Sequence, residues 1–159
     1  MKAIGLNFAD VYRRKGNYHL EGQPPYVLGY EGAGIVEQLG SDVTEIQVGQ
    51  RIAFADVPFA NAELVAVPVE KAIPIPETIS LEEASSVLLQ GLTAHYLTKD
   101  SYAVQKGDVV LVHAAAGGVG FSGASGTLHR SGSDAARSAP EIDGGGNAGG
   151  CSRRHDLLA

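Results

Sequence analysis

The sequence lacks most of the features that point to a secreted, membrane-bound or nucleic-acid-binding protein. Its single cysteine, Cys151, excludes a disulfide within the chain and a multi-cysteine zinc cluster. No apolar run is long enough to cross a membrane, and no basic segment followed by an apolar stretch opens the chain as a secretory signal would. The formal net charge of −6 argues against nucleic acid as a partner. These absences leave a soluble, cytoplasmic protein as the expectation.

What the sequence does contain is a strand-like run that leads into a cluster of glycines. Val109 to Val112 is short, β-branched and uninterrupted, which is typical of a strand buried on both faces of a parallel sheet. Residues 115–120, Ala-Ala-Gly-Gly-Val-Gly, keep a G-x-G-x-x-G spacing with Ala at the first glycine. Such a turn lets backbone N–H groups approach a pyrophosphate at the start of a helix. A glycine-rich loop without a ligand is the alternative, and the strand favours the nucleotide site.

The first part of the chain is predicted to form a helix and several short strands. Asn7 can cap a helix that ends at Gly16, with acidic Asp10 in its first turn and basic residues in its last. Ahead of it, residues 2–5 resemble the end of a strand. Strand-like or extended segments follow, separated by glycine and proline turns, at residues 27–37, 48–54, 62–67 and 71–76. Many short strands of this kind predict a small β-barrel.

The apolar period changes at Ser80. Ser80-Leu-Glu-Glu83 fits a capping box, and apolar residues then follow at helical spacing. Residues 91–97 are expected to form a second helix before the strand and the glycine turn. A barrel, helices and a parallel strand with a phosphate turn predict two domains joined near residue 90. The expected fold class is mixed β and α/β, with residues 1–90 and 91–120 as the two parts.

Residues 121–159 differ in composition from everything before them. Gly, Ser and Ala make up about half of this segment, few residues are large and apolar, and all of its basic residues are Arg. Such a segment cannot bury enough apolar surface to offset its ordering entropy. We therefore expect a disordered, low-complexity tail.

Taken together, residues 2–120 resemble the zinc-independent quinone oxidoreductases (zeta-crystallin type) of the medium-chain dehydrogenase/reductase family. The resemblance depends on five blocks in fixed order, which are Ala3 to Asp10, Leu28-Gly-Tyr-Glu-Gly-Ala-Gly34, Val48-Gly-Gln-Arg51, Leu89-Gln-Gly-Leu-Thr-Ala94 and Gly107 to Gly120. It implies a partial GroES-like barrel followed by the first strand and glycine turn of a Rossmann domain.

The resemblance also implies that no metal is needed. Zinc-using alcohol dehydrogenases have Cys where this chain has Asn7, and His where it has Tyr30. Neither residue is a plausible zinc ligand. The four-cysteine structural zinc loop is absent as well.

The family uses NADPH and passes its hydride to a quinone or another activated alkene or carbonyl. Tyr12 is the implied catalytic residue, because its phenol can donate to a developing oxyanion. The residues implied to bind the cofactor are Asn7 and Thr93 near the nicotinamide, and Ala116, Gly117, Gly118, Val119 and Gly120 under the pyrophosphate. Structural alternatives stay open, since Asn7 can simply cap its helix and Tyr12 can be a half-buried aromatic at the barrel edge. His95 and His113 are interpreted as structural histidines.

Two departures from the family bear on activity. Strands that precede Lys2 in the family have no counterpart here, and the resemblance ends abruptly after Gly120, where Phe121 to Gly126 contains no helix-forming pattern. We hypothesise that residues 121–159 are an out-of-frame translation or a mispredicted gene end, so that the chain is truncated at both ends. Resequencing the locus tests this, because an uninterrupted frame that reproduces the tail contradicts it. The chain itself is then expected to have little or no activity.

Three readings of the function remain. The first is an NADPH-dependent quinone reductase with a small quinone or enone substrate, without nucleic acid or membrane as a partner. The second is a non-catalytic GroES-like fragment that acts as a packing or interaction module. The third is enoyl reduction on the same fold. Family members are commonly homodimers, and the sequence leaves the oligomeric state of this chain open.

Overall fold

A computed structural model describes residues 1–20, 22–123 and 155–157 of the chain. The chain separates into two compact units, Met1–Leu89 and Gln90–Ala159, and each unit is described here by itself. No helix within the described ranges is long and apolar enough to span a membrane.

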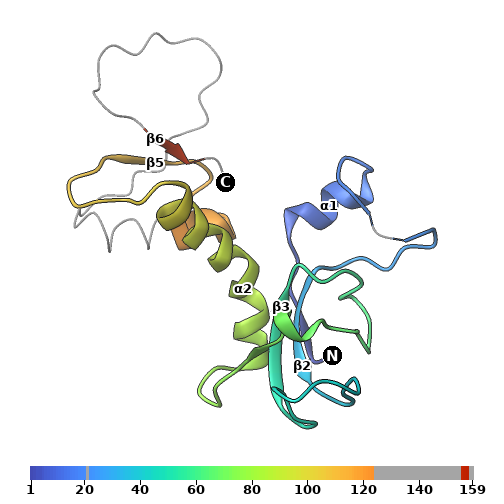
Figure 1. Cartoon of the computed structure of the whole chain (residues 1–159). Coiled ribbons are helices and arrows are strands. Elements are labelled where there is room, and N and C mark those ends of the chain that lie inside the picture. Colours follow the sequence, from blue (N-terminus) through green and yellow to red (C-terminus); the bar gives the residue numbers. More distant parts are fainter. Residues whose placement is uncertain (21, 124–154, 158–159) are drawn as a thin grey trace. The chain divides into compact units, whose positions relative to one another are not determined.

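The first unit is built on a four-stranded antiparallel sheet. Its strands are β1 (Ala3–Ile4), β2 (Glu31–Ile35), β3 (Arg51–Ala55) and β4 (Ile73–Pro74), in the order β1-β2-β3-β4. β2 and β3 lie side by side at its centre (Figure 1), with Ala33 opposite Ala53 and Gly32 opposite Phe54. The described strands thus form an open sheet.

The core of this unit lies against one side of the sheet around Phe54, which is 1% exposed. Val57 and Ala60 are buried beside it, and Met1, Val65 and Val67 pack against the cluster. A side chain at Gly32 would overlap Met1 and come within 3.2 Å of the Phe54 ring. The glycine in β2 therefore makes room for the core.

Helix α1 (Phe8–Arg14) confirms the predicted helix between Asn7 and Gly16. Asn7 is its N-cap residue, with extended backbone angles, and the Asp10 carboxylate accepts the Asn7 backbone N–H at 3.0 Å. The chain leaves the helix at Gly16, where φ is +75°, a conformation that favours glycine.

Helix α2 (Leu81–His95) begins at the predicted capping box. The Glu83 N–H donates to Ser80 Oγ at 3.0 Å, and the Ser80 N–H donates to Glu83 Oε2 at 2.8 Å. The prediction of a separate second helix at residues 91–97 is wrong, because α2 continues through Gly91, where a side chain would meet nothing within 4 Å. A π-helical segment, η2 (Tyr96–Ser101), follows directly.

The segment at residues 62–67, predicted as a strand, is not one. The N–H groups of Ala60 and Asn61 donate to the carbonyls of Gly29 and Leu28, and the chain then bends away from the sheet. Its apolar side chains Val65 and Val67 serve the Phe54 core instead of a strand ladder. A 3₁₀ helix, η1 (Val69–Lys71), leads from there into β4.

In the second unit, strand β5 (Val110–Val112) pairs in parallel with β6 (His155–Leu157). The expectation of a strand buried on both faces from Val109 is wrong. Val109 is 70% exposed, and within β5 only Val112 is buried, because the described sheet of this unit has just two strands.

Two short pieces of residues 121–159 are among the described residues. Residues 118–123 are helical, and the Phe121 N–H donates to the Gly117 carbonyl at 2.8 Å. The expectation that no helix follows the glycine turn is therefore wrong. Further along, residues 155–157 form β6. Residues 124–154 and 158–159 lie outside the described residues. The division at residue 90 into a substrate domain and a dinucleotide-binding domain stays a prediction.

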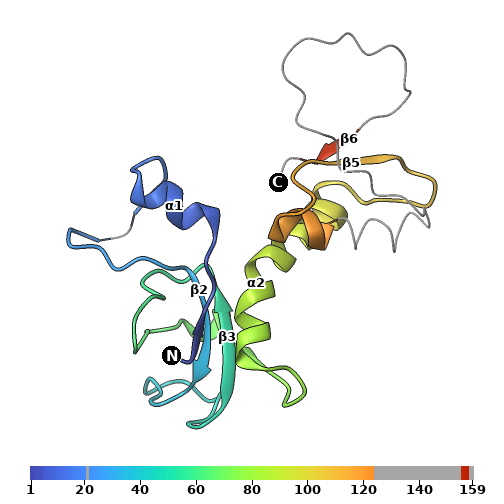
Figure 2. The same ribbon diagram turned by 180° about the vertical axis from the view of Figure 1, so that it is seen from behind.

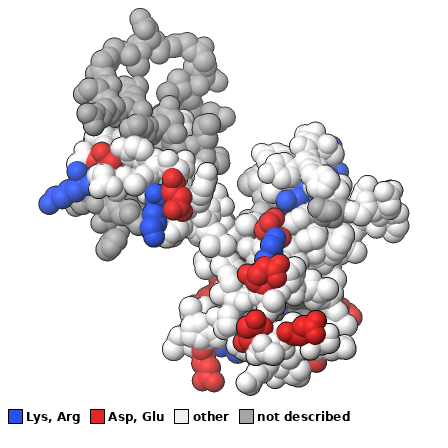
Figure 3. Space-filling view, in the orientation of Figure 1, with Lys and Arg blue, Asp and Glu red and all other residues white. Residues whose placement is uncertain are grey.

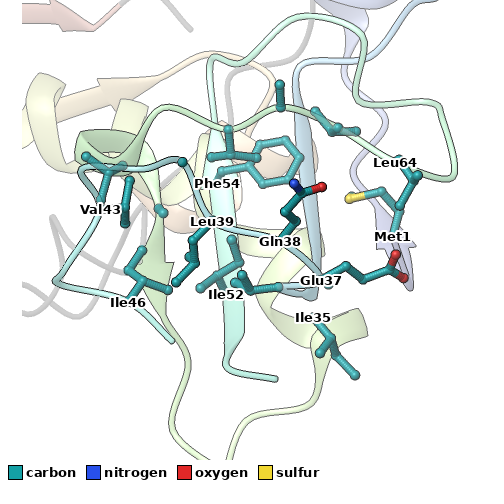
Figure 4. A pocket seen from close by; sticks show the side chains of 18 residues that line it. Met1, Ile35, Glu37, Gln38, Leu39, Val43, Ile46, Ile52, Phe54 and Leu64 are labelled. Atoms are coloured by element: carbon teal, nitrogen blue, oxygen red, sulfur yellow. The ribbon is translucent and has the colours of Figure 1, made fainter. Parts of the chain in front are cut away.

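The first unit also has a mainly apolar cavity of about 510 Å³. It is lined by Met1, the end of β2 and the loop that follows it, Phe54 and residues 64–67 (Figure 4). None of the eight predicted site residues lines this cavity. On the face of this unit seen in Figure 3, acidic side chains are more prominent than basic ones, in keeping with the net charge of −6.

Candidate functional site

Asn7, a predicted cofactor-binding residue, is held at both its backbone and its side chain. The Asp10 carboxylate accepts its backbone N–H, as described for α1. Its side-chain Nδ2 donates to Glu31 Oε2 at 2.8 Å. The capping interpretation is thus correct for the position of Asn7 at the helix start, but its amide group is engaged by a residue from β2. Its role toward a cofactor stays a prediction.

Glu31 is the most deeply buried charged residue near this point, at 0% exposed. Its second oxygen, Oε1, accepts the backbone N–H of Leu89 from α2 at 2.7 Å. A side chain at Gly5 would overlap Glu31 Oε2 and lie 2.6 Å from the Ser85 carbonyl oxygen. Because burial of a carboxylate is costly unless it is hydrogen-bonded, these two N–H donors account for its place between β1, β2 and α2.

A buried aromatic and charged cluster continues from Asp10 toward β2. Arg13 is 8% exposed, and its Nη1 lies 3.6 Å from Asp10 Oδ1. Its guanidinium carbon lies 3.5 Å from the centre of the Tyr30 ring and 5.0 Å from that of Tyr18. Asp10 Oδ1 and Arg13 Nε are both buried without a hydrogen-bond partner. Cation–π contacts and the ion pair therefore hold the guanidinium in place.

Tyr12, the predicted catalytic residue, lies on α1 and is 47% exposed. Its ring is tilted by 38° to that of Phe8, with 6.3 Å between ring centres. Its backbone carbonyl accepts the N–H of Asn17. The phenol side chain is thus half-exposed on a short helix whose first residue follows Asn7, and its catalytic role stays a prediction.

The glycine turn of the second unit is closed by its own backbone. The Gly117 N–H donates to the Ala114 carbonyl at 2.8 Å, and Ala114 has a left-handed φ of +48°. A side chain at Gly120 would overlap the Ala114 carbonyl and lie 2.7 Å from the Ala115 Cα. The structure therefore brings residues 116–120 together in a tight turn that opens a helix, with Gly120 buried and Ala116, Gly117 and Gly118 exposed.

Gln90 packs against this turn from within the same unit. A side chain at Gly118 would lie 2.7 Å from Gln90 Cγ, and Gln90 Oε1 is buried without a hydrogen-bond partner. Thr93, the remaining predicted cofactor residue, lies one helical turn further along α2 and is half-buried. His95 and His113 are both exposed, so they do not have the buried setting expected of structural histidines.

The described residues hold no group of three or more His, Cys, Asp or Glu side chains close enough together to bind a metal ion. Tyr30, at the position where the resemblance compares a zinc-binding His, is buried with its ring against Arg13.

The sequence of the chain is similar to those of known oxidoreductases. Residues 1–77 match the family model of the alcohol dehydrogenase GroES-like domain. A quinone oxidoreductase from Pseudomonas aeruginosa is 48% identical over 121 residues, which are 76% of this chain and 37% of that protein. This chain is a homologue of quinone oxidoreductases and carries a GroES-like domain.

Two further proteins support the assignment. A 2-haloacrylate reductase from a Burkholderia species is 42% identical over 123 residues, covering 74% of this chain and 37% of that protein. The crystal structure of the Escherichia coli quinone oxidoreductase complexed with NADPH superposes with a TM-score of 0.77 at 38% identity, over 82% of this chain and 40% of that one. The chain thus spans 37% of the length of the Pseudomonas protein and of the Burkholderia protein.

Sequence reasoning missed the residues that surround the predicted ones. Glu31, Arg13 and Gln90 are polar side chains whose contacts in the structure are buried. The sequence contained one signal for Glu31, which begins a strand whose other residues are glycine, alanine and isoleucine. A charged residue beside such a run is seldom buried unless it is paired, so a buried partner could have been expected. The sequence does not say which residue pairs with it.

Proposed function

We propose that this chain carries cofactor-binding elements of an oxidoreductase that transfers hydride from NADPH to a quinone or to another activated alkene or carbonyl. The observation that carries the proposal is the turn at residues 114–120, where a side chain at Gly120 does not fit and a helix begins at residue 118. The names of the relatives and the NADPH complex of the E. coli protein support it.

The turn suits a pyrophosphate for two physical reasons. Ala116, Gly117 and Gly118 are exposed and bring little or no side-chain bulk between the backbone and a ligand. The first N–H groups of a helix have no partner within that helix, and the helix dipole favours an anion there. We infer that the backbone of residues 116–120 would hold the pyrophosphate and that Thr93, in the same unit, would contact the nicotinamide. For Asn7, in the first unit, a contact with the nicotinamide is proposed from the family resemblance alone.

NADPH, when bound, supplies the hydride. Reduction of a quinone then also requires a proton at the oxygen that becomes negative. We infer that Tyr12 donates a hydrogen bond to that oxygen, because its phenol is half-exposed and a developing oxyanion needs a positioned donor more than a strong acid. The name of the Burkholderia relative, a 2-haloacrylate reductase, supports an activated alkene as an alternative acceptor.

A fluorescence titration of the purified 159-residue chain with NADPH is the first test. Saturable quenching or a blue shift of NADPH emission supports the proposal, and a parallel titration with NADH reports the preference for the 2′-phosphate. A flat titration contradicts it and favours the second candidate, a non-catalytic GroES-like module. That candidate has its own support, since residues 1–77 match the family model of that domain.

Turnover is expected to be little or none. The chain spans 37% of the length of the relatives, and activity named for them belongs to the longer proteins. An assay with 1,4-benzoquinone and NADPH measures this, and a rate well above the buffer blank contradicts the expectation. Sedimentation of the same sample reports whether the chain forms the homodimer common in the family.

A further inference from the structure

Residues 64–67 have the side-chain pattern of a strand but no strand partner. Val65 and Val67 pack against the buried core of the first unit, whereas Leu64 and Ala66 are exposed. This is the alternation of a half-buried strand. The N–H and C=O groups of residues 64–67 form no backbone hydrogen bond with another described residue. The segment is therefore a free strand edge, which is a template for pairing with another chain.

The free edge borders the apolar cavity of the first unit. Residues 64–67 line one part of this cavity, and residues 37–39, which follow β2, line another. Residues 37–39 likewise form no backbone hydrogen bond with another described residue. Figure 4 shows Val43 at one end of the cavity and Leu64 at the other. Apolar side chains and unused backbone groups thus surround one space.

The size of the cavity suits a short extended segment and excludes a folded partner. Its volume is about 510 Å³, within the range of roughly 300–1,000 Å³ that takes a small ligand. The same segment of a second copy does not fit, because its own core covers one of its faces. A single extended peptide does fit, since it needs only a free edge and room for alternate side chains.

The charges around the cavity favour a basic peptide. Among the described residues that line it, Glu37 carries the one charged side chain, and that side chain is exposed. Glu63 and Glu70, which flank the free edge in the sequence, are exposed as well. These carboxylates are complementary to cations at the ends of an apolar segment, and complementary charge favours one partner over another.

We propose that this cavity binds an extended peptide that has alternating apolar side chains and a basic residue at each end, and that the peptide adds a strand to residues 64–67. The backbone of the peptide pairs with the free edge, its apolar side chains enter the cavity, and its basic ends meet the carboxylates. The first unit alone holds this site. The proposal is therefore independent of the cofactor and of hydride transfer.

A peptide titration tests the pairing on the unchanged chain. The probe is fluorescein-labelled Lys-Val-Thr-Val-Thr-Val-Lys with a blocked carboxyl end, titrated with the full 159-residue chain and followed by fluorescence anisotropy. We expect saturable binding. The same peptide N-methylated at all its central residues should bind about tenfold or more weakly, because it cannot donate backbone hydrogen bonds. Absence of saturable binding, or equal binding of the two peptides, overturns the proposal.

The charge of the peptide is tested separately. A probe with Glu in place of both Lys residues should bind more weakly, and the difference should shrink as salt is added, because salt screens exposed charges. Equal binding of the two probes at low salt overturns the basic character of the partner.

A pair of exposed residues locates the site on the chain. Leu64→Lys places a cation at the cavity, and Val48→Lys places one outside it, at side chains that are 69% and 61% exposed. Because both positions are exposed, the fold should accept both changes, and circular dichroism checks this. We expect Leu64→Lys to weaken binding of the Lys-ended probe about threefold to tenfold, through lost apolar contact and like-charge repulsion, and Val48→Lys to weaken it less. Equal Kd values for the two variants overturn the site.

Sedimentation of the chain with and without the probe tests the remaining occupant, a second copy. We expect the probe to bind without changing the oligomeric state. A dimer that Leu64→Lys dissociates and that the probe does not displace overturns the peptide as the occupant of the cavity.

Discussion

The two parts of the predicted site are built in opposite ways. Around Asn7 the structure uses side chains from distant parts of the chain, with Asp10, Arg13, Tyr30 and Glu31 all buried. The glycine turn of the second unit uses neighbouring backbone atoms, and most of its residues are exposed. Figure 2 shows α1 above the strands of the first unit and, in the second unit, the short helix (orange) that follows β5. The first arrangement fixes side-chain direction, and the second removes side chains so that backbone is accessible.

The two arrangements should differ in how well they tolerate amino-acid substitutions. A buried cluster tolerates few changes, because each polar group depends on a partner that the change leaves unpaired. A backbone turn tolerates any residue that its local conformation allows. Substitutions in the first should therefore cost folding stability, and substitutions in the second should cost ligand binding at little cost in stability.

The largest effect is expected at Arg13. Arg13→Ala removes the cation from between Tyr18 and Tyr30 and leaves Asp10, which is 4% exposed, without its charged partner. Removing one member of a buried ion pair costs about 3 kcal/mol or more in free energy of unfolding. Urea unfolding followed by circular dichroism measures it. Arg14→Ala, at an exposed neighbour, is the control and should change stability by about 0.5 kcal/mol or less. Equal losses of unfolding free energy in Arg13→Ala and Arg14→Ala would show that the buried contacts of Arg13 do not stabilise the fold.

The next effect tests whether a glycine of the first unit serves packing. Gly29 has φ of +95°, and a side chain there would lie 2.7 Å from the Asn61 backbone nitrogen. Gly49 has a similar φ of +86° with nothing within 4 Å. Gly49→Ala should cost about 1 kcal/mol from backbone conformation alone, and Gly29→Ala about 2 kcal/mol because overlap adds to it. The same unfolding experiment compares the two. A smaller loss for Gly29→Ala than for Gly49→Ala would contradict the packing role.

The glycine turn should respond in binding. A side chain at Gly120 would lie 2.7 Å from the Ala114 carbonyl carbon, so Gly120→Ala must open the turn. We expect the Kd for NADPH to rise about tenfold, which corresponds to about 1.4 kcal/mol. Gly123→Ala is the matched control, since it lies in the same helix with nothing within 4 Å. If Gly120→Ala binds NADPH as tightly as Gly123→Ala does, the turn is not the pyrophosphate site.

The same contrast explains what the sequence could predict. The capping box at Ser80, the helix that Asn7 caps and the glycine turn are local, so spacing alone predicts them, and the structure has all three. The contact of Asn7 with Glu31 joins residues 24 positions apart, and no local pattern contains that information. The helix at residues 118–123 was missed for a related reason. Its composition is poor in helix formers, but the turn before it is already closed by the bond from the Gly117 N–H to the Ala114 carbonyl. This lowers the cost of starting a helix, and the Gly117 carbonyl then accepts the Phe121 N–H.

The smallest effect concerns another local motif and depends on pH. Hydrogen bonds from the backbone N–H and the side chain of Ser80 lower the pKa of Glu83 below its ordinary value of 4.5. Because the pKa is lower in the folded chain than in the unfolded chain, the charged form stabilises α2 above about pH 4.5, and this contribution is lost as the pH falls through the lowered pKa. Glu83→Gln should therefore lower the melting temperature slightly at pH 7 and flatten its decline below pH 4.5. Melting curves from pH 7 to pH 3 measure this, with Glu82→Gln, an exposed neighbour that follows the same Ser80, as the control. Identical pH profiles for the two variants would mean that the capping box contributes nothing measurable. The fully exposed position of Glu83 makes this the weakest of the four effects, since water competes for every bond the carboxylate forms.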